Sequence, residues 1–247
     1  MIHPAPIRGV GVVLPAHNEE DHVGAALAAL RVALDELQTA HPRVTAAATI
    51  ILDHCTDNTA DIALAHASAD PRVNVAEVQL RNVGGSRAHG VRSILQLFPG
   101  IRAEDVWIAN TDADSMVPRH WLSRQLDMAN TGVDAILGSV EPEPRDLDQA
   151  VLRRWLELHP FRENHSHVYG ANLGIRASAY LAAGGFPDLS SHEDRELVEK
   201  LHGQGFNVRS TDTIRVITSG RTLGRAPLGF GAYLRSLATE LPAATGG

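Results

Sequence analysis

The first half of the chain repeats one pattern four times: a short apolar run, a polar loop, and then a segment whose apolar residues have helical spacing. In the first unit the β-branched run Val10 to Leu14 stops at Pro15, and the amphipathic segment Asp21 to Gln38 follows. The next three strands are expected at Val44 to Leu52, Val73 to Leu80 and Val106 to Asn110. Strands that alternate with helices in this way predict an α/β fold with a mostly parallel, Rossmann-like sheet covered by helices on both faces.

The second half of the chain is less regular. It predicts strands at Asp134 to Val140 and Thr213 to Ile217, and helices at Leu147 to Leu158, Ser178 to Ala183 and His192 to Gly203. No repeat or linker separates the two halves, so we expect a single domain over residues 1–247.

Composition excludes several classes of function. Twenty-two basic residues against 29 acidic ones give a net charge of −7, which argues against a general nucleic-acid binder. No apolar run approaches the ~18 residues that span a bilayer, and the N-terminus lacks an apolar signal core. The lone cysteine, Cys55, fits a reducing compartment, so a cytoplasmic protein is expected. Lys200 is the only lysine, which excludes a P-loop.

Polar loops follow each of the first four expected strands. Because ligands of such sheets sit beyond the carboxyl ends of the strands, these loops are the candidate binding site. The fourth strand is followed by Asp112-Ala113-Asp114, a D-x-D motif whose hard oxygen ligands suit Mg²⁺ or Mn²⁺ bridging a diphosphate. The alternative is an ordinary turn in which an Asp bonds its own backbone.

The other loops form an ordered set with this motif. Pro15-Ala16-His17-Asn18-Glu19 follows the first strand, Asp53 ends the second, and Asn82 to Arg87 follows the third. Gly170-Ala171-Asn172 and His192-Glu193-Asp194 come later. In this order the motifs resemble those of the family 2 glycosyltransferases, which have the GT-A fold, over about residues 8 to 205.

The resemblance implies a role for each matching position. The residues that would bind the donor nucleotide are Pro15, Ala16, Asn18, Glu19, Asp53, Arg87, Asp112 and Ala113. Asp114 would ligate the divalent cation, with Asp112 at the ribose or the water shell of the metal. Gly170, Ala171 and Asn172 would line the sugar and acceptor pocket, Asp194 would be the general base, and Glu193 would position a substrate. The nucleotide-binding half would cover about 1–115 and the acceptor-binding half about 116–247.

These roles predict a metal-dependent inverting hexosyltransferase. The cation would stabilise charge on the leaving diphosphate, while Asp194 would deprotonate the acceptor hydroxyl. The expected partners are a UDP- or GDP-linked sugar and an unknown hydroxyl acceptor. One alternative is a nucleotidyltransferase, although residues 15–20 lack its Gly-rich basic loop. Another is a nucleotide-sugar-binding protein without turnover. A homodimer through the apolar stretch Pro227 to Leu237 is also considered, although the same stretch can pack on the sheet.

Each assignment has a structural alternative. Asn18 and Glu19 can cap the first helix, Asp53 can form an Asx turn, and Arg87 can be a solvated helix residue. The acidic pair that includes Asp194 can simply favour a helix N-terminus.

The sequence also departs from the family pattern. The loop after the second strand keeps only one acidic group, Asp53, and His54 replaces a Gly of the family pattern. No histidine follows His202 to supply a further metal ligand. The tail carries Arg221 and Arg225 instead, which can either close over the diphosphate or remain surface charges.

Overall fold

The computed structural model describes residues 6–222 and 229–240, which form one eight-stranded sheet and its covering helices. The strands are β1 (Gly9–Ala16), β2 (Thr45–Asp53), β3 (Val73–Val78), β4 (Val106–Asn110), β5 (Ser115–Met116), β6 (Ala135–Pro142), β7 (Leu173–Arg176) and β8 (Val208–Thr218). The α-helices are α1 (Val23–Ala40), α2 (Thr59–Ala69), α3 (Val83–Leu97), α4 (Trp121–Asn130), α5 (Gln149–Leu158), α6 (Ala177–Ala182), α7 (Glu193–Gly203) and α8 (Phe230–Glu240).

The strand order is β3-β2-β1-β4-β7-β6-β8-β5. Strands β1 to β4 pair in parallel, as do β6 and β8, whereas β7 runs antiparallel between β4 and β6. The predicted α/β fold with a mostly parallel sheet is therefore confirmed. The two short strands β5 and β7 are additions to the prediction, because neither is long enough to show an alternating apolar pattern.

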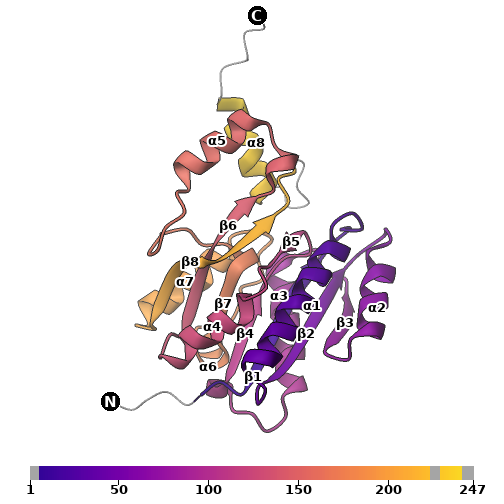
Figure 1. Cartoon of the computed structure of the whole chain (residues 1–247), viewed down its shortest axis with the longest axis vertical. Coiled ribbons are helices and arrows are strands. Elements are labelled where there is room, and N and C mark those ends of the chain that lie inside the picture. The colour runs from indigo at the N-terminus through magenta and orange to yellow at the C-terminus, as the bar shows by residue number, and fades with distance from the viewer. Residues whose placement is uncertain (1–5, 223–228, 241–247) are drawn as a thin grey trace, which may run out of the picture.

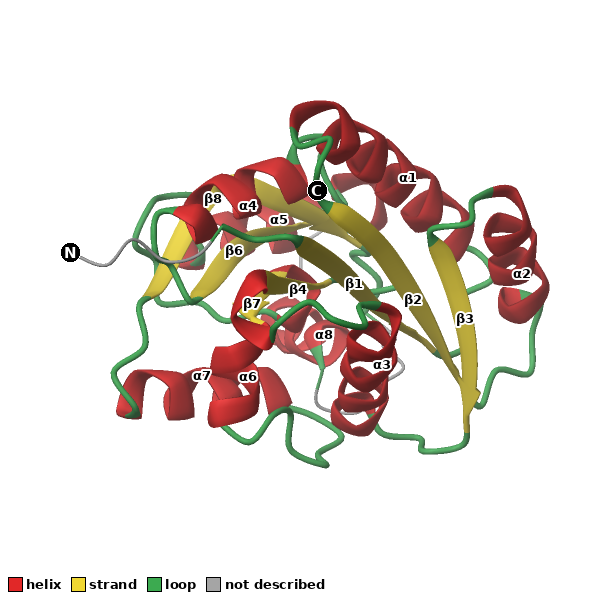
Figure 2. Cartoon of the chain, turned by 90° about the horizontal axis from the view of Figure 1, so that it is seen from below, coloured by secondary structure: helices red, strands yellow, loops and turns green. Residues whose placement is uncertain are grey.

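Helices cover both faces of the curved sheet (Figure 2). Because successive strand side chains point to opposite faces, neighbouring residues of β1 enter different cores. Val12 packs in the core that contains Leu30 of α1, and Val13 packs in the core that contains Ile94 of α3. Helices α1 and α4 lie on the first face, and α3, α6 and α7 lie on the second (Figure 2).

Helices α5 and α8 pack on one another at one end of the molecule, beyond β6 and β8 (Figure 1). Their shared core includes Trp155 and Leu234, both fully buried. The apolar stretch considered for a homodimer thus packs on α5 from Phe230 onward, and its residues 227–228 lie outside the described residues. No described helix is both long and apolar enough to cross a membrane.

Candidate active site

The carboxyl ends of three strands meet at one edge of the sheet. Ala16 of β1 lies beside Leu52 of β2, and Val13 of β1 lies beside Asn110 at the end of β4. The loops that follow these strands therefore gather at that edge, as the parallel arrangement predicts.

Arg87 lies at the centre of the site. Its side chain is only 2% exposed, so the interpretation of Arg87 as a solvated helix residue is wrong. The guanidinium donates from Nη2 to Oδ1 of Asp112 at 2.5 Å and from Nε to Oε1 of Glu193 at 3.1 Å. Burial lowers the pKa of Arg87, but the charges of Asp112 and Glu193 outweigh this effect and raise it. One cation thus joins the D-x-D motif to the acidic pair that begins α7.

Asp194 is fixed by backbone donors beside this arginine. Its Oδ2 accepts the N–H of Gly170 at 2.6 Å, and its Oδ1 accepts the N–H of Arg195 at 2.8 Å. A Cβ at position 170 would lie 2.6 Å from Nη2 of Arg87, so only glycine fits without moving the guanidinium. Arg87 and Asp112, predicted to bind the donor, are therefore joined to Gly170 of the predicted acceptor pocket and to Asp194, the predicted base.

Glu193 is buried next to Asp194. Burial raises the pKa of the Glu193 carboxyl, and the charge of Arg87 opposes that rise. Glu193 and Asp194 both lie in the first turn of α7, where acidic side chains favour a helix N-terminus. Their contacts with Arg87 and Gly170 show that they also bind other elements of the fold.

Asp114 lies in a cluster of charged groups. Its Oδ1 accepts hydroxyl hydrogen bonds from Ser115 and Thr218, each at 3.2 Å, and its Oδ2 is 3.0 Å from Nη2 of Arg221. Burial and the neighbouring charge of Asp112 raise the pKa of Asp114 to about 6, even though Arg221 opposes this rise.

The negative charge of Asp112 and Glu19 near Asp114 suits a site for a divalent cation that also binds the phosphates of a substrate. The charges of Asp112 and Glu19 both disfavour the ionised form of Asp114. A bound cation would offset this repulsion between the carboxylates. Within residues 6–222 and 229–240, no cluster of three or more His, Cys, Asp or Glu residues could hold a metal ion by itself. Mg²⁺ is commonly bound by one or two carboxylates plus phosphates and water, so Asp114 and Asp112 suit that arrangement.

Asp53 has its carboxylate committed to the fold. Oδ1 accepts the N–H groups of Leu80 and Arg81, and Oδ2 accepts the N–H of Asn82 and the hydroxyl of Ser86, at 2.8–3.1 Å. Burial alone would raise the pKa of Asp53, but these hydrogen bonds outweigh it and hold the pKa below its usual value. The donors are not those of an Asx turn. They belong to the loop that leads into α3 and to the first turn of α3, which carries Arg87. Its contact with a nucleotide stays a prediction.

Asn172 is likewise enclosed. It is fully buried, its Oδ1 accepts from Nε1 of Trp121 at 2.9 Å, and its Nδ2 donates to the carbonyls of Ser139 and Ile214 at 2.8 Å. The amide therefore points into the core and fixes the backbone of the turn Gly170–Asn172. Ala171 and Ala113 are also buried.

The loop after β1 is tied to the loop after β2. Oδ1 of Asn18 accepts the N–H of Thr56 at 2.7 Å, and the N–H of Glu19 donates to the hydroxyl of Thr59 at 2.6 Å. Asn18 has a φ of 54°, in the left-handed region that Asn tolerates. The N-cap position of α1 is His22, not Asn18 or Glu19, and His22 makes no side-chain cap hydrogen bond. Pro15 and Ala16 supply backbone at the same edge.

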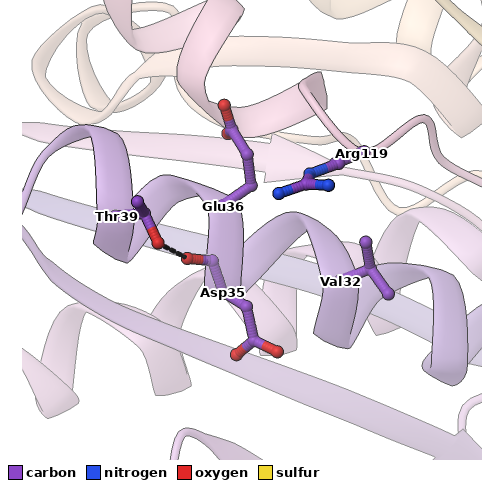
Figure 3. A pocket seen from close by; sticks show the side chains of 5 residues that line it. All are labelled: Val32, Asp35, Glu36, Thr39 and Arg119. Atoms are coloured by element: carbon purple, nitrogen blue, oxygen red, sulfur yellow. Dashed lines mark hydrogen bonds between the residues drawn. The ribbon is translucent and has the colours of Figure 1, made fainter.

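A depression of about 260 Å³ lies away from these groups, on the outer face of α1 (Figure 3). Its lining residues are Val32, Asp35, Glu36, Thr39 and Arg119. Four of these residues come from the second half of α1, which runs back from the carboxyl edge, and Arg119 lies just before α4, so the depression is separate from the candidate site.

The partners of Arg221 could not be predicted from the sequence. Its guanidinium forms a two-pronged pair with Glu19, with both N···O distances at 2.5 Å, in addition to its contact with Asp114. Nothing local in the sequence predicts partners from the first and fourth strand loops. Arg225, the second arginine considered for a lid, lies outside the described residues.

The order of the strands, with the antiparallel β7 between β4 and β6, is that of a GT-A type sheet. The model of the family "Glycosyl transferase family 2" matches residues 11–182, and the chain belongs to that family. The predicted family is thereby confirmed. No curated protein matched the chain in direct comparison.

Solved structures share the fold. A mannosyltransferase from Pyrobaculum calidifontis in complex with GDP-Man and Mn²⁺ is 17% identical, with a TM-score of 0.58 over 90% of this chain. The chain covers only 59% of that protein's length. Glucosyl-3-phosphoglycerate synthase from Mycobacterium tuberculosis, in complex with Mn²⁺, UDP-Glc and glycerol 3-phosphate, is 16% identical, with a TM-score of 0.56 over 96% of this chain and 82% of its own.

Proposed function

We propose that the protein transfers a sugar from a UDP- or GDP-linked donor to an acceptor hydroxyl in one inverting step that depends on a divalent cation. The observation that carries this proposal is the Arg87 network, which places Asp112 and Glu193 on one guanidinium with Asp194 next to it in the chain. A donor bound at the D-x-D motif and an acceptor bound near α7 would then be neighbours. Structural relatives bound to GDP-Man or UDP-Glc together with Mn²⁺ support the choice of donor and cation.

Asp194 has the arrangement that a general base requires. Its two backbone donors fix the direction in which the carboxylate points. A carboxylate held in this way can accept the proton of an acceptor hydroxyl that lies against it. The acceptor oxygen would lose its proton to Asp194 and form a bond to the anomeric carbon. The bond from that carbon to the phosphate oxygen would break, and its electron pair would leave with the nucleoside diphosphate.

The remaining groups would hold the donor. Asp114 and Asp112 would bind the cation, which when bound neutralises charge on the departing diphosphate. Arg87 holds Asp112 and Glu193 in place from a buried position and so positions both sides of the reaction. The sugar of the donor would lie beside Gly170, on the solvent side of Arg87.

The test combines binding with turnover. Thermal unfolding is measured with a panel of UDP- and GDP-sugars, with and without Mn²⁺, because a ligand that binds the folded state raises the Tm. We expect one donor to stabilise the protein only when Mn²⁺ is present, and Asp114→Asn to remove that effect. Asp127→Asn, an exposed carboxylate paired with His41, is the matched control.

Turnover is tested with Asp194→Asn, assayed by mass spectrometry over an acceptor panel chosen with the wild-type protein. Transfer should fall by about 10²-fold or more while donor affinity stays within a few-fold. Glu196→Gln removes a charge two residues further along α7, where Glu196 pairs with Lys200, and should leave transfer unchanged. Donor binding without any product would instead identify a binding protein, and synthesis of a nucleotide sugar would identify a nucleotidyltransferase.

A further inference from the structure

Arg221 is the counter-ion that Asp114 has in this structure. It lies three residues after Thr218, the last residue of β8. Thr218 pairs with Ser115 of β5, and the N–H of Ser219 donates to the carbonyl of Asp114 at 3.1 Å. The end of β8 is thus bound to the D-x-D loop. That connection places the Arg221 guanidinium between Asp114 and Glu19.

The two carboxylates hold Arg221 unequally. Glu19 is 7% exposed and grips the guanidinium with both oxygens at 2.5 Å, whereas Asp114 makes one contact at 3.0 Å through Oδ2. Two-pronged pairs of this kind are the strongest arginine contacts, so the link to Asp114 is the weaker of the two. Oδ1 of Asp114 is held separately by the hydroxyls of Ser115 and Thr218.

We infer that Arg221 and a divalent cation are alternative partners of Asp114, and that Glu19 retains the guanidinium when the cation takes Oδ2. The inference rests on the proposed function, because it takes the D-x-D motif as the metal site. Arg221 is a positioning residue in this scheme. In the absence of metal it neutralises the acidic cluster, and once released from Asp114 it keeps hydrogen-bond donors beside the site for an incoming diphosphate.

If Arg221 competes with the cation for Asp114, removing Arg221 should raise the affinity for Mn²⁺ even without nucleotide. In calorimetric titrations, Arg221→Gln should bind Mn²⁺ about tenfold more tightly than the wild-type protein, the order expected when one charge-assisted hydrogen bond no longer competes. Arg221→Lys keeps the charge but cannot span both carboxylates, so it should bind Mn²⁺ a few-fold more tightly. Arg102→Gln, which removes an arginine paired with Asp105, is the control and should match the wild-type affinity.

Simple charge repulsion between Arg221 and the cation predicts a different pattern. Arg221→Lys would then bind Mn²⁺ with the wild-type affinity. That result would refute the inference that Arg221 and the cation exchange at Asp114. Equal or weaker binding by Arg221→Gln would overturn it too. Binding of Mn²⁺ that Asp114→Asn does not weaken would contradict the metal site itself, and with it the proposed function.

A second measurement uses the unchanged protein, in case Arg221→Gln does not fold. The ¹⁵N side-chain resonance of Arg221 is assigned by its loss in Arg221→Lys and followed during a Mg²⁺ titration. We expect this resonance to shift to a new saturated position as its contact with Asp114 is replaced. A resonance that stays in place while Mg²⁺ saturates the protein would show that the guanidinium does not exchange.

Discussion

The substitution Asp53→Asn distinguishes two roles for Asp53: stabilising the fold through its hydrogen bonds, or contacting the nucleotide. The carboxylate accepts four hydrogen bonds, two on each oxygen, three from the loop between β3 and α3 and one from Ser86 in the first turn of α3. An Asn keeps one carbonyl oxygen and turns an NH₂ group toward donors, which leaves the N–H of Asn82 without an acceptor. The two retained bonds also lose their charge assistance, at about 1 kcal/mol each, and the orphaned N–H adds about 1–3 kcal/mol.

We therefore expect Asp53→Asn to lower the free energy of unfolding by about 3–5 kcal/mol without any ligand, measured by urea denaturation at pH 7. The Tm should fall by about 6–20 °C for a chain of this size. Asp61→Asn, in the exposed first turn of α2, is the matched control and should change the stability by less than about 0.5 kcal/mol.

The effect should depend on pH in one direction. The pKa of Asp53 is lower in the folded protein than its usual value, so its contribution is complete above that value, about 3.9, and disappears as the pH falls through the folded pKa. The difference between wild type and Asp53→Asn should be constant from pH 7 to about 5 and shrink below about pH 4. Unchanged stability combined with weaker donor binding would refute the anchoring role and favour direct contact with the nucleotide.

Three further substitutions test the same site. Gly170→Ala places a Cβ against the buried guanidinium of Arg87 and should destabilise the protein by about 1–3 kcal/mol in denaturant; a neutral effect would mean that the guanidinium has room to move. Arg87→Met leaves Glu193 buried without its cation and should cost about 3–5 kcal/mol at pH 7, with a smaller loss at acidic pH as Glu193 takes up a proton. Asn172→Ala should cost about 3 kcal/mol or more because it orphans the indole N–H of Trp121; stability within about 1 kcal/mol of wild type in urea would contradict this.

The periodic parts of the fold could be read from the sequence. The expected strand Val106 to Asn110 coincides with β4, and the helix expected from Asp21 begins at Val23. Both carry apolar patterns that depend only on neighbouring residues. Strand β7 has four residues and becomes a strand because β4 and β6 flank it, which a local pattern does not reveal.

The candidate site was predictable in its members and not in their contacts. The order of the motifs located Asp112, Asp114 and Asp194, because residue type and position relative to the strands are properties of the sequence. The burial of Arg87 was not predictable, since its partners lie 25 and 106 residues away in the chain. The contact of Arg221 with Glu19 spans 202 residues and depends on how β8 ends against β5.

The place of β7 in the sheet has a consequence for biosynthesis. As the chain emerges from the ribosome, β1 to β4 can assemble from consecutive segments, but the outer edge of β4 must wait for Leu173–Arg176. That edge carries the large hydrophobic residues Trp107 and Ile108, both fully buried in the finished protein. Open apolar edges are templates for intermolecular pairing, so nascent chains and shortened versions that stop before β7 are the species that should aggregate.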